Sequence, residues 1–415
     1  MERISTHLPN DNMVYHLRQR QEEMLDTQNR IASQSRIEEL RDDPIAAAHA
    51  TRHSSFLARL QRFSTNIERV QSEYQVAEGH IRQAVDLMQR ARELAVQGAN
   101  GTYTGEDLEK MAVEVDQILN ELVNVANAQD GTGRTVFSGT RSSTPAFRSV
   151  TGVVGGEEKR MITNVDYVGT IDTREAEIGE RAFIEANIPG NEVFWAEQQT
   201  IFAEVDTGGY QVDEDSSIFI DGEEIALSQG DTAQTIIAKI NDSPAAVRAR
   251  LDPVQNGIVI ETTTPHQIWL RDGEGSTVLE DLGLIASDDA PPPQNIAAGA
   301  RRFGGSAFDM LIQLRDAMIE GNQEDLGGSA LGGVDSALDN LLTNLAKIGA
   351  RTARLDSAYE RSGREIPDQM ARLSMETDID LAATITDLRR LEQTHQAALG
   401  VTARIIQPTL LQFLR

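Results

Sequence analysis

Apolar residues recur in steps of three and four along four long stretches of the chain. These stretches cover residues 67–95, 108–125, 334–359 and 381–406, and a weaker stripe runs through Leu17, Met24 and Ile31. Alternating steps of three and four keep apolar side chains on one side of a helix, as in coiled coils and long helical bundles. The pattern therefore predicts long helices in both the amino-terminal and the carboxyl-terminal parts of the chain.

Residues that start and stop helices fit these stretches. Gly98-Ala99-Asn100-Gly101 is expected to end the helix that begins near residue 67, and Thr104 stands three residues before Asp107, the spacing of a helix cap. Asp42-Asp43-Pro44 predicts a break in the first helix, because a residue before proline avoids the helical region. The break would separate a terminal helical segment from the main bundle.

The middle of the chain has a different period. Apolar residues alternate with polar ones in Ser217–Ile225, and Asp221-Gly222 has the composition of a hairpin turn between two short strands. One short helix is expected over Thr232–Ile240, followed by strands at Ala245–Leu251 and Gly257–Thr262. Pro291-Pro292-Pro293 has the composition of a stiff connector after this α+β or mainly β unit.

The predicted fold class is a multidomain α plus β protein. In the simplest interpretation, both chain ends build one long helical bundle or coiled coil, and a β-rich domain is inserted in the middle. The expected domains are residues 1–44 with 376–415 as a terminal helical pair, 45–147 with 300–375 as the bundle, and 148–299 as the inserted outer domain. The alternative is two separate helical bundles that flank a β domain.

The composition narrows the possible functions. The 415 residues carry 38 Lys and Arg against 65 Asp and Glu, a net charge of −27, which argues against binding to nucleic acid or to anionic membranes. Residues 151–300 hold 28 acidic and 8 basic side chains, so −20 of this charge lies in the predicted insert. The chain has no cysteine, which excludes disulfides, thiolate metal sites and cysteine nucleophiles. No apolar run reaches the ~20 residues of a membrane span, and the first residues lack the apolar core of a secretory signal.

Candidate chemistry is sparse. The sequence contains no GxxxxGK[ST], HExxH or GxSxG motif. Gly131–Val136 has glycines but is expected to form only a turn, and His49 and His53 at i and i+4 have no third metal ligand nearby. We therefore expect no enzyme activity, no cofactor and no metal.

Six short blocks, in order across both chain ends, resemble the flagellin superfamily. They are Ile31–Ile37, Arg41–Ala47, Ala77–Gly79, Arg92–Thr102, Ile348–Arg351 and Gln407–Leu414. The opening Arg3-Ile4-Ser5-Thr6, Phe137-Ser138-Gly139-Thr140, Tyr167-Val168-Gly169 and Ile188–Phe194 are similar to the members of that superfamily that join the hook to the filament. The resemblance covers residues 1–145 and 300–415.

The resemblance implies a structural subunit of the bacterial flagellum, located at the hook–filament junction and exported unfolded by the flagellar type III route. Its implied partners are neighbouring copies of itself in a ring, hook-associated protein 1, flagellin and an export chaperone, with no nucleic acid and no membrane insertion. A filament-forming flagellin with an unusual insert is the alternative. An enzyme or carbohydrate-binding module within 151–290 is a third hypothesis.

The terminal helices are the candidate assembly interface. The carboxyl-terminal stripe is interrupted by Glu392, His395 and Thr402, so a pair of these helices buries little apolar surface. We expect this pair to be largely disordered in the monomer and to order against neighbouring copies. The predicted interface residues are Leu17, Met24, Ile31, Leu381, Ile385, Leu388, Leu399, Ile406, Leu410, Leu411 and Phe413.

Overall fold

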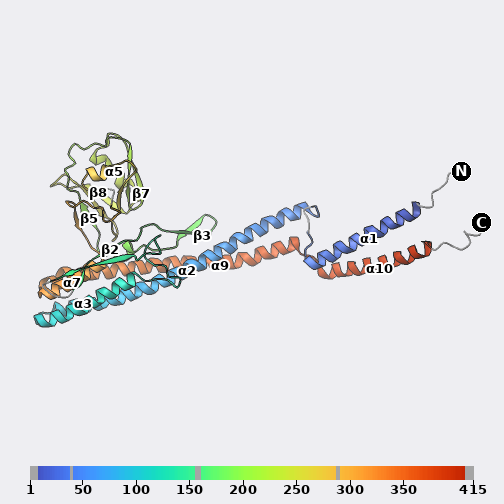
Figure 1. The fold of residues 1–415 in the computed structure, drawn as a ribbon, viewed down its shortest axis with the longest axis horizontal. Helices are drawn as coiled ribbons and strands as arrows, with labels where there is room; N and C mark the ends of the chain where they lie inside the picture. Colours follow the sequence, from blue (N-terminus) through green and yellow to red (C-terminus); the bar gives the residue numbers. More distant parts are fainter. Residues whose placement is uncertain (1–7, 38–40, 155–159, 287–289, 407–415) are drawn as a thin grey trace, which may run out of the picture. The chain divides into compact units, whose positions relative to one another are not determined.

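The structure, a computed structural model, describes residues 8–37, 41–154, 160–286 and 290–406 (Figure 1). The chain divides into two compact units. Unit 1 contains residues 1–65 and 359–415, and unit 2 contains residues 66–358. The long helices α2 (Pro44–Gly98) and α9 (Leu331–Thr377) contribute residues to both units.

The core of unit 2 is a helical bundle. It is built from α2, α3 (Gly105–Ala126), α7 (Ala307–Glu320) and α9, with α8 (Gln323–Asp325) and a π-helix (Leu326–Ala330) before α9. The predicted stripe residues Ile67, Val70, Val334 and Leu341 are fully buried in it. As predicted, α2 ends at Gly98 and Thr104 forms a reciprocal cap with Asp107. Helices from distant parts of the chain therefore share one apolar core.

Two small hairpins pack into this same core. They are β1 (Phe147–Val153) with β2 (Arg160–Tyr167) and β3 (Glu175–Gly179) with β4 (Ala182–Glu185), followed by the short α4 (Gly190–Val193). Phe147 lies 5.0 Å from Phe308 of α7, measured between ring centroids, and both rings are buried. The fully buried Arg315 of α7 joins the two parts, because Nη1 donates to the Asp116 carboxylate of α3 (3.1 Å) and to the Ile162 carbonyl of β2 (2.8 Å).

Residues 197–304, here called the head, have a second core. One antiparallel sheet has the order β11 (Arg301–Phe303), β5 (Thr200–Phe202), β9 (Ile258–Thr262), β8 (Val247–Leu251). The other has the order β10 (Leu270–Asp272), β6 (Ser216–Ile220), β7 (Glu223–Leu227). Both sheets, α5 (Ala233–Asp242) and α6 (Val278–Asp281) enclose a separate apolar cluster.

The head joins the rest of unit 2 through two chain segments that are hydrogen-bonded to each other. The Ala196 amide donates to the Gly305 carbonyl (2.9 Å), and the Ala307 amide donates to the Phe194 carbonyl (2.8 Å). The chain thus enters and leaves the head at adjacent points.

Unit 1 contains α1 (Leu8–Ser33), α10 (Leu381–Ile406) and the adjoining segments of α2 and α9. The helix break predicted at Asp42-Asp43-Pro44 is present, since α1 ends at Ser33 and α2 begins at Pro44. Gln34, just after α1, has φ 54°, a left-handed conformation that is uncommon for a residue other than glycine and stops the helix there.

The predicted fold class is confirmed: long helices from both chain ends flank a central β-rich region. In the head, Asp221-Gly222 forms the expected hairpin turn with φ 51° and 86°, and α5, β8 and β9 lie where the sequence indicates. The three domain boundaries drawn from the sequence, including a discrete insert at 148–299, stay predictions.

Candidate assembly surface

The α1 and α10 helices pair along a narrow seam. On α10 the partly buried positions are Thr384, Ile385, Leu388, Leu391, His395 and Ala398, and on α1 they include Leu17, Met24 and Ile31. Among the described side chains of these two helices none is fully buried, whereas Ile67 and Leu341 in unit 2 are completely enclosed. The seam alone therefore gives the pair little hydrophobic stabilisation.

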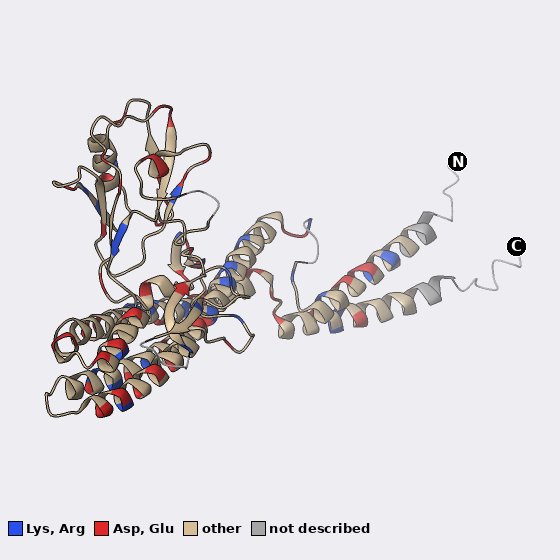
Figure 2. Ribbon diagram, turned by 60° about the vertical axis from the view of Figure 1, so that its left-hand side comes forward, with Lys and Arg blue, Asp and Glu red and all other residues tan. Residues whose placement is uncertain are grey.

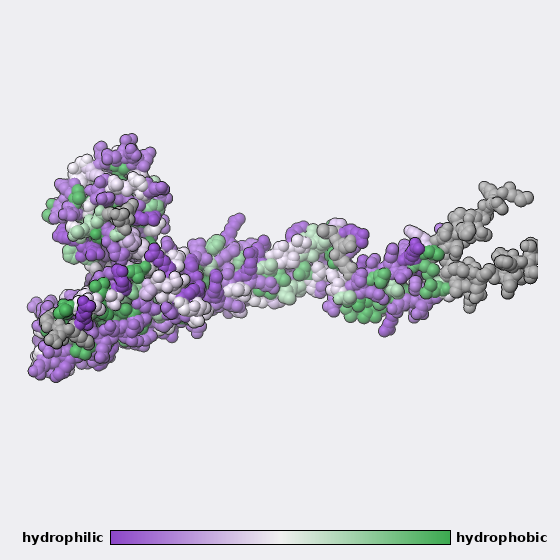
Figure 3. Space-filling model, in the orientation of Figure 1, coloured by the Kyte–Doolittle hydropathy of each residue, from purple (hydrophilic) through white to green (hydrophobic). Residues whose placement is uncertain are grey.

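Apolar side chains also lie on the outer faces of unit 1. Tyr15 is 66% exposed, Met375 82%, Leu381 44% and Leu399 47%, and green apolar surface is visible over these helices in Figure 3. Further exposed apolar residues of the unit are Val14, Leu25, Ile45, Met370 and Val401. An apolar residue on each of several faces is the arrangement expected of helices that are covered by more than one neighbour.

The predicted interface residues fall into three groups. Leu17, Met24, Ile31, Ile385 and Leu388 are partly buried between α1 and α10, while Leu381 and Leu399 face outward. The Ile406 side chain, Leu410, Leu411 and Phe413 lie outside the described residues.

The seam differs in one detail from the sequence stripe. Leu391 and Ala398 are more buried than Glu392 and Leu399, because a 3.6-residue helix drifts against a strict heptad stripe. The apolar stripes did not predict the exposed Tyr15 and Met375, because these two residues lie outside the stripes. The only signal for them in the sequence is a large apolar residue at a position where a polar one is expected.

The junction between the helices in unit 1 is held by polar contacts. The Arg36 amide donates to the Thr377 carbonyl (2.6 Å), and the Arg36 guanidinium donates to the Glu376 carbonyl (2.8 Å) and pairs with Asp43 (3.2 Å). The segment after α1 is thus hydrogen-bonded to the end of α9, so the helix break after α1 lies beside the helix break between α9 and α10.

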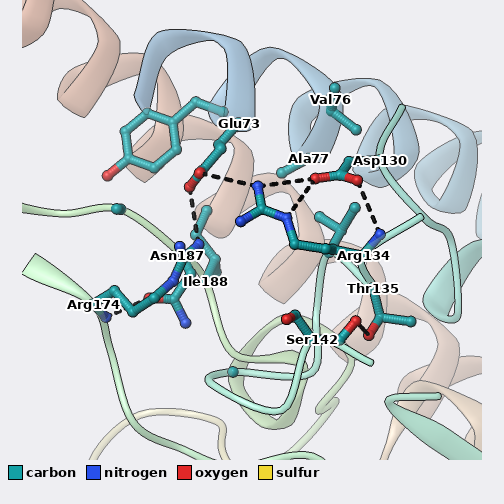
Figure 4. Close-up of a pocket in the computed structure, with 14 residues that line it drawn as sticks. Glu73, Val76, Ala77, Asp130, Arg134, Thr135, Ser142, Arg174, Asn187 and Ile188 are labelled. Carbon is teal, nitrogen blue, oxygen red and sulfur yellow. Dashed lines mark hydrogen bonds and ion pairs between the residues drawn. The ribbon is translucent and has the colours of Figure 1, made fainter. Parts of the chain in front are cut away.

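A small cavity in unit 2 lies beside α2 and is lined by an ion cluster (Figure 4). Arg174 pairs with Glu73 at 3.0 Å, Arg134 approaches Glu73 at 3.6 Å, and Arg134 pairs with Asp130 at 3.1 Å. The space of about 40 Å³ has room for only a few water molecules. Two arginines balance two carboxylates, so the cluster is a structural contact between α2 and the turn that follows α3.

Asp130 organises that turn. Its carboxylate accepts from the Thr132 hydroxyl (2.6 Å) and from the Thr132 and Arg134 amides, and these hydrogen bonds hold the pKa of Asp130 well below its usual range. The segment Gly131–Val136 is a turn, as predicted, with Gly133 at φ 80°.

The two histidines with metal-like spacing have other neighbours. The His53 Nδ1 atom lies 3.0 Å from the Gln369 side-chain oxygen, and His49 lies 3.5 Å from the Glu376 carboxylate. No cluster of three or more possible metal ligands occurs among the residues that the structure describes. In the same described ranges, no helix has the length and hydrophobicity needed to cross a membrane.

Comparison with protein families identifies the amino-terminal part of the chain. Residues 4–142 match the family model described as the bacterial flagellin N-terminal helical region. The amino-terminal third of this chain is therefore similar to flagellins. In the structure, the matched residues of that region form α1, α2 and α3.

Curated relatives include both junction and filament proteins. The chain is 28% identical over 169 residues to the flagellar hook-associated protein 3 of Salmonella typhimurium, which covers 41% of this chain and 53% of that protein. It is 32% identical over 148 residues to flagellin FlaB1 of Treponema pallidum, covering 34% and 50% respectively. The chain thus spans about half the length of the curated relatives it matches.

Among solved structures, hook-associated protein 3 of Legionella pneumophila aligns with 82% of this chain and 98% of its own, at 18% identity and a TM-score of 0.45. Xanthomonas campestris FlgL aligns with 78% and 99%, at 18% identity and the same TM-score.

The family match and the curated relatives confirm the resemblance to the flagellin superfamily and to hook-associated protein 3 within it. The matched proteins are structural components of the bacterial flagellum and not enzymes, in agreement with the predicted class and localisation.

Proposed function

We propose that this flagellin-type chain is the adaptor subunit at the hook–filament junction, where copies of it form a short ring. The observation that carries the proposal is the flagellin helical region together with outward apolar side chains on every described helix of unit 1. Ring neighbours would cover Leu399, Leu381 and Met375, which the chain itself leaves in water.

The proposed partners follow from this position. One side of the ring would contact hook-associated protein 1 and the other flagellin, and a dedicated chaperone would shield the carboxyl-terminal helix before export. The absence of cysteine is compatible with unfolded passage through the flagellar type III export channel.

A filament-forming flagellin is the second candidate, because both a hook-associated protein 3 and a flagellin are among the relatives that match this chain. Antibody against the head, detected by gold labelling on isolated flagella, separates the two. A junction adaptor gives one short labelled band between hook and filament. Label along the whole filament supports the flagellin alternative, and unlabelled flagella contradict both.

The terminal helices are proposed to order fully only on assembly, because their seam buries no described side chain completely. Limited trypsin digestion of the free monomer should cut first at the exposed Arg389 and Arg390, well before the main bundle. In isolated flagella the same sites should be protected. Equal resistance of α10 and α9 in the free monomer would contradict ordering on assembly.

A further inference from the structure

The head carries a small basic and aromatic face in an otherwise acidic domain. Residues 197–304 contain 19 acidic and 6 basic side chains, a net charge of 6 − 19 = −13. Three of those six, Arg248, Arg250 and Arg301, lie on the outer face of one sheet. Figure 2 shows how few blue positions stand among the tan and red of the head.

Strand register places these arginines around two phenylalanines. Phe202 on β5 stands opposite Arg301 on β11 and, through Val259, in line with Arg250 on β8. The Arg301 and Arg250 guanidinium carbons lie 5.3 and 5.8 Å from the Phe202 ring centroid, within the range of cation–π contacts.

The second aromatic ring widens this face. Phe303 packs edge-on against Phe202 at 5.6 Å and is 56% exposed. The inner residues Ile201, Ala249 and Ile260 belong to the head core, so the face points away from it. We call Arg248, Arg250, Arg301, Phe202 and Phe303 the arginine face.

Carboxylates are scarce on the arginine face. Glu261 is the only acidic residue on this side of the four strands, and no ion pair joins a carboxylate to Arg248, Arg250 or Arg301 among the described residues. Arg301 reaches only the amide oxygen of Gln255, at 3.5 Å. The face therefore keeps its positive charge available to an external partner.

A cluster of carboxylates, here called the acidic ridge, lies in segments of the head outside the strands that carry the arginine face. Asp213 and Glu214 are exposed in the turn that leads into β6, and Asp281 ends α6 nearby. Burial raises the pKa of Tyr210 to about 12, and the nearby carboxylates of Asp281, Asp272 and Asp213 add to this shift.

We infer that the arginine face of one head docks onto the acidic ridge of the head of a neighbouring copy. This inference rests on the proposed ring. A contact between two different surfaces of identical chains repeats around a closed ring, so each copy would supply one face and receive the other. Charge complementarity selects this occupant, because the same domain offers an excess of carboxylates and the arginine face lacks them.

The absence of cysteine allows a direct test by cross-linking. The full chain with Val254→Cys and Glu214→Cys is expressed in place of the native one; Val254 is exposed in the turn between β8 and β9, beside the arginine face. A short bismaleimide added to isolated flagella should give a ladder of linked multimers. Neither single variant should give more than a faint dimer.

Charge reversal then tests the chemistry in the same double-cysteine chain. Arg250→Glu with Arg301→Glu should reduce the linked fraction at least fivefold. Arg271→Glu is the matched control, because Arg271 also lies over a phenylalanine ring, Phe219 at 4.6 Å, but on the other sheet. Adding Asp213→Lys to Arg250→Glu and Arg301→Glu should restore part of the ladder.

The outcomes distinguish the two proposals when the same flagella are labelled with antibody. Two results together support the contact: a labelled junction band, and a cross-linked ladder that is weakened by the charge reversal at Arg250 and Arg301 but not by Arg271→Glu. A normal junction band without a ladder, or a ladder that is insensitive to the reversal, overturns the contact and leaves the adaptor function standing. Absence of the chain from the flagellum overturns both.

Discussion

The main bundle and the terminal helical pair are built from the same kind of amphipathic helix but differ in how completely they bury their apolar side chains. In the bundle, four helices and two hairpins enclose Ile67, Leu341 and Phe308 completely. In the pair, α1 and α10 share one seam, and Leu399 and Tyr15 stay in water. A stripe is therefore sufficient for a helix but not for a buried core, because burial requires partners on more than one side.

Because of this difference, we expect the bundle to determine the stability of the monomer and the terminal pair to determine its assembly. Substitutions in the bundle should change folding of the monomer, whereas substitutions in the pair should change only what the monomer joins. The predictions that follow are ordered by their expected effect on unfolding of the bundle.

The largest effect is expected for Arg315→Ala. The substitution leaves Asp116 buried without its cation and the Ile162 carbonyl without its donor, and breaking a buried pair in this way costs about 3–5 kcal/mol. Chemical denaturation followed by circular dichroism measures the change. Arg69→Ala, at an exposed position of α2, is the control with a change below about 0.5 kcal/mol. A loss under 1 kcal/mol for Arg315→Ala would mean that the buried contacts of Arg315 with Asp116 and with the hairpin do not stabilise the bundle.

Leu341→Ala should lower the free energy of unfolding of the bundle by about 2–5 kcal/mol, as expected for a fully buried leucine. The same change at the partly exposed Leu388 should leave that transition unchanged and accelerate exchange only in α10. Hydrogen exchange resolved by segment distinguishes the two helices. If both variants lost protection from hydrogen exchange equally in α9, the bundle and the terminal pair would not differ in stability as proposed.

Deletion of the head should have a smaller effect. Because the Ala196 amide is bonded to the Gly305 carbonyl, residues 197–304 can be replaced by two glycines, and the bundle core then loses only the partly buried Trp269, which packs against Tyr167. We expect the melting temperature of the bundle to change by only a few degrees, roughly the shift produced by 1 kcal/mol. Deletion of 151–290 should be more damaging, because it also removes Ile162 and Tyr167 from the bundle core. If the two deletions melt alike, the hairpins do not stabilise the bundle.

The smallest effect on folding is expected for Leu399→Asp. Leu399 is exposed in the monomer, so the unfolding free energy of the bundle should change by less than about 0.5 kcal/mol. In the proposed ring the same position is covered, and each copy would bury an unpaired carboxylate at several kcal/mol. Cells should then secrete unassembled filament protein and fail to swim.

Leu399→Met keeps the apolar surface and is the control for that variant. An immunoblot of the medium shows whether the aspartate variant is still exported. A normal junction and normal motility with exported Leu399→Asp would exclude this face of α10 from the interface.

Much of the local structure could be predicted from the sequence. Gly98, the Thr104–Asp107 cap, the break before Pro44 and the Asp221-Gly222 turn all act within a few residues, so their patterns identify them directly. The stripes also identified the side chains of the bundle core, since period alone decides which residues share one face of a helix.

The tertiary structure decided which faces of those helices have partners. The sequence could not indicate that Phe147 and Ile162 belong to the bundle core while Ile201 and Ile260 belong to the head, because strand period shows that a residue is buried but not against what. It also could not bring Arg315 to Asp116, 199 residues away, or align Arg250, Phe202 and Arg301 across four strands. Contacts between distant segments depend on strand register and helix packing, and these are set by the whole fold rather than by any local pattern.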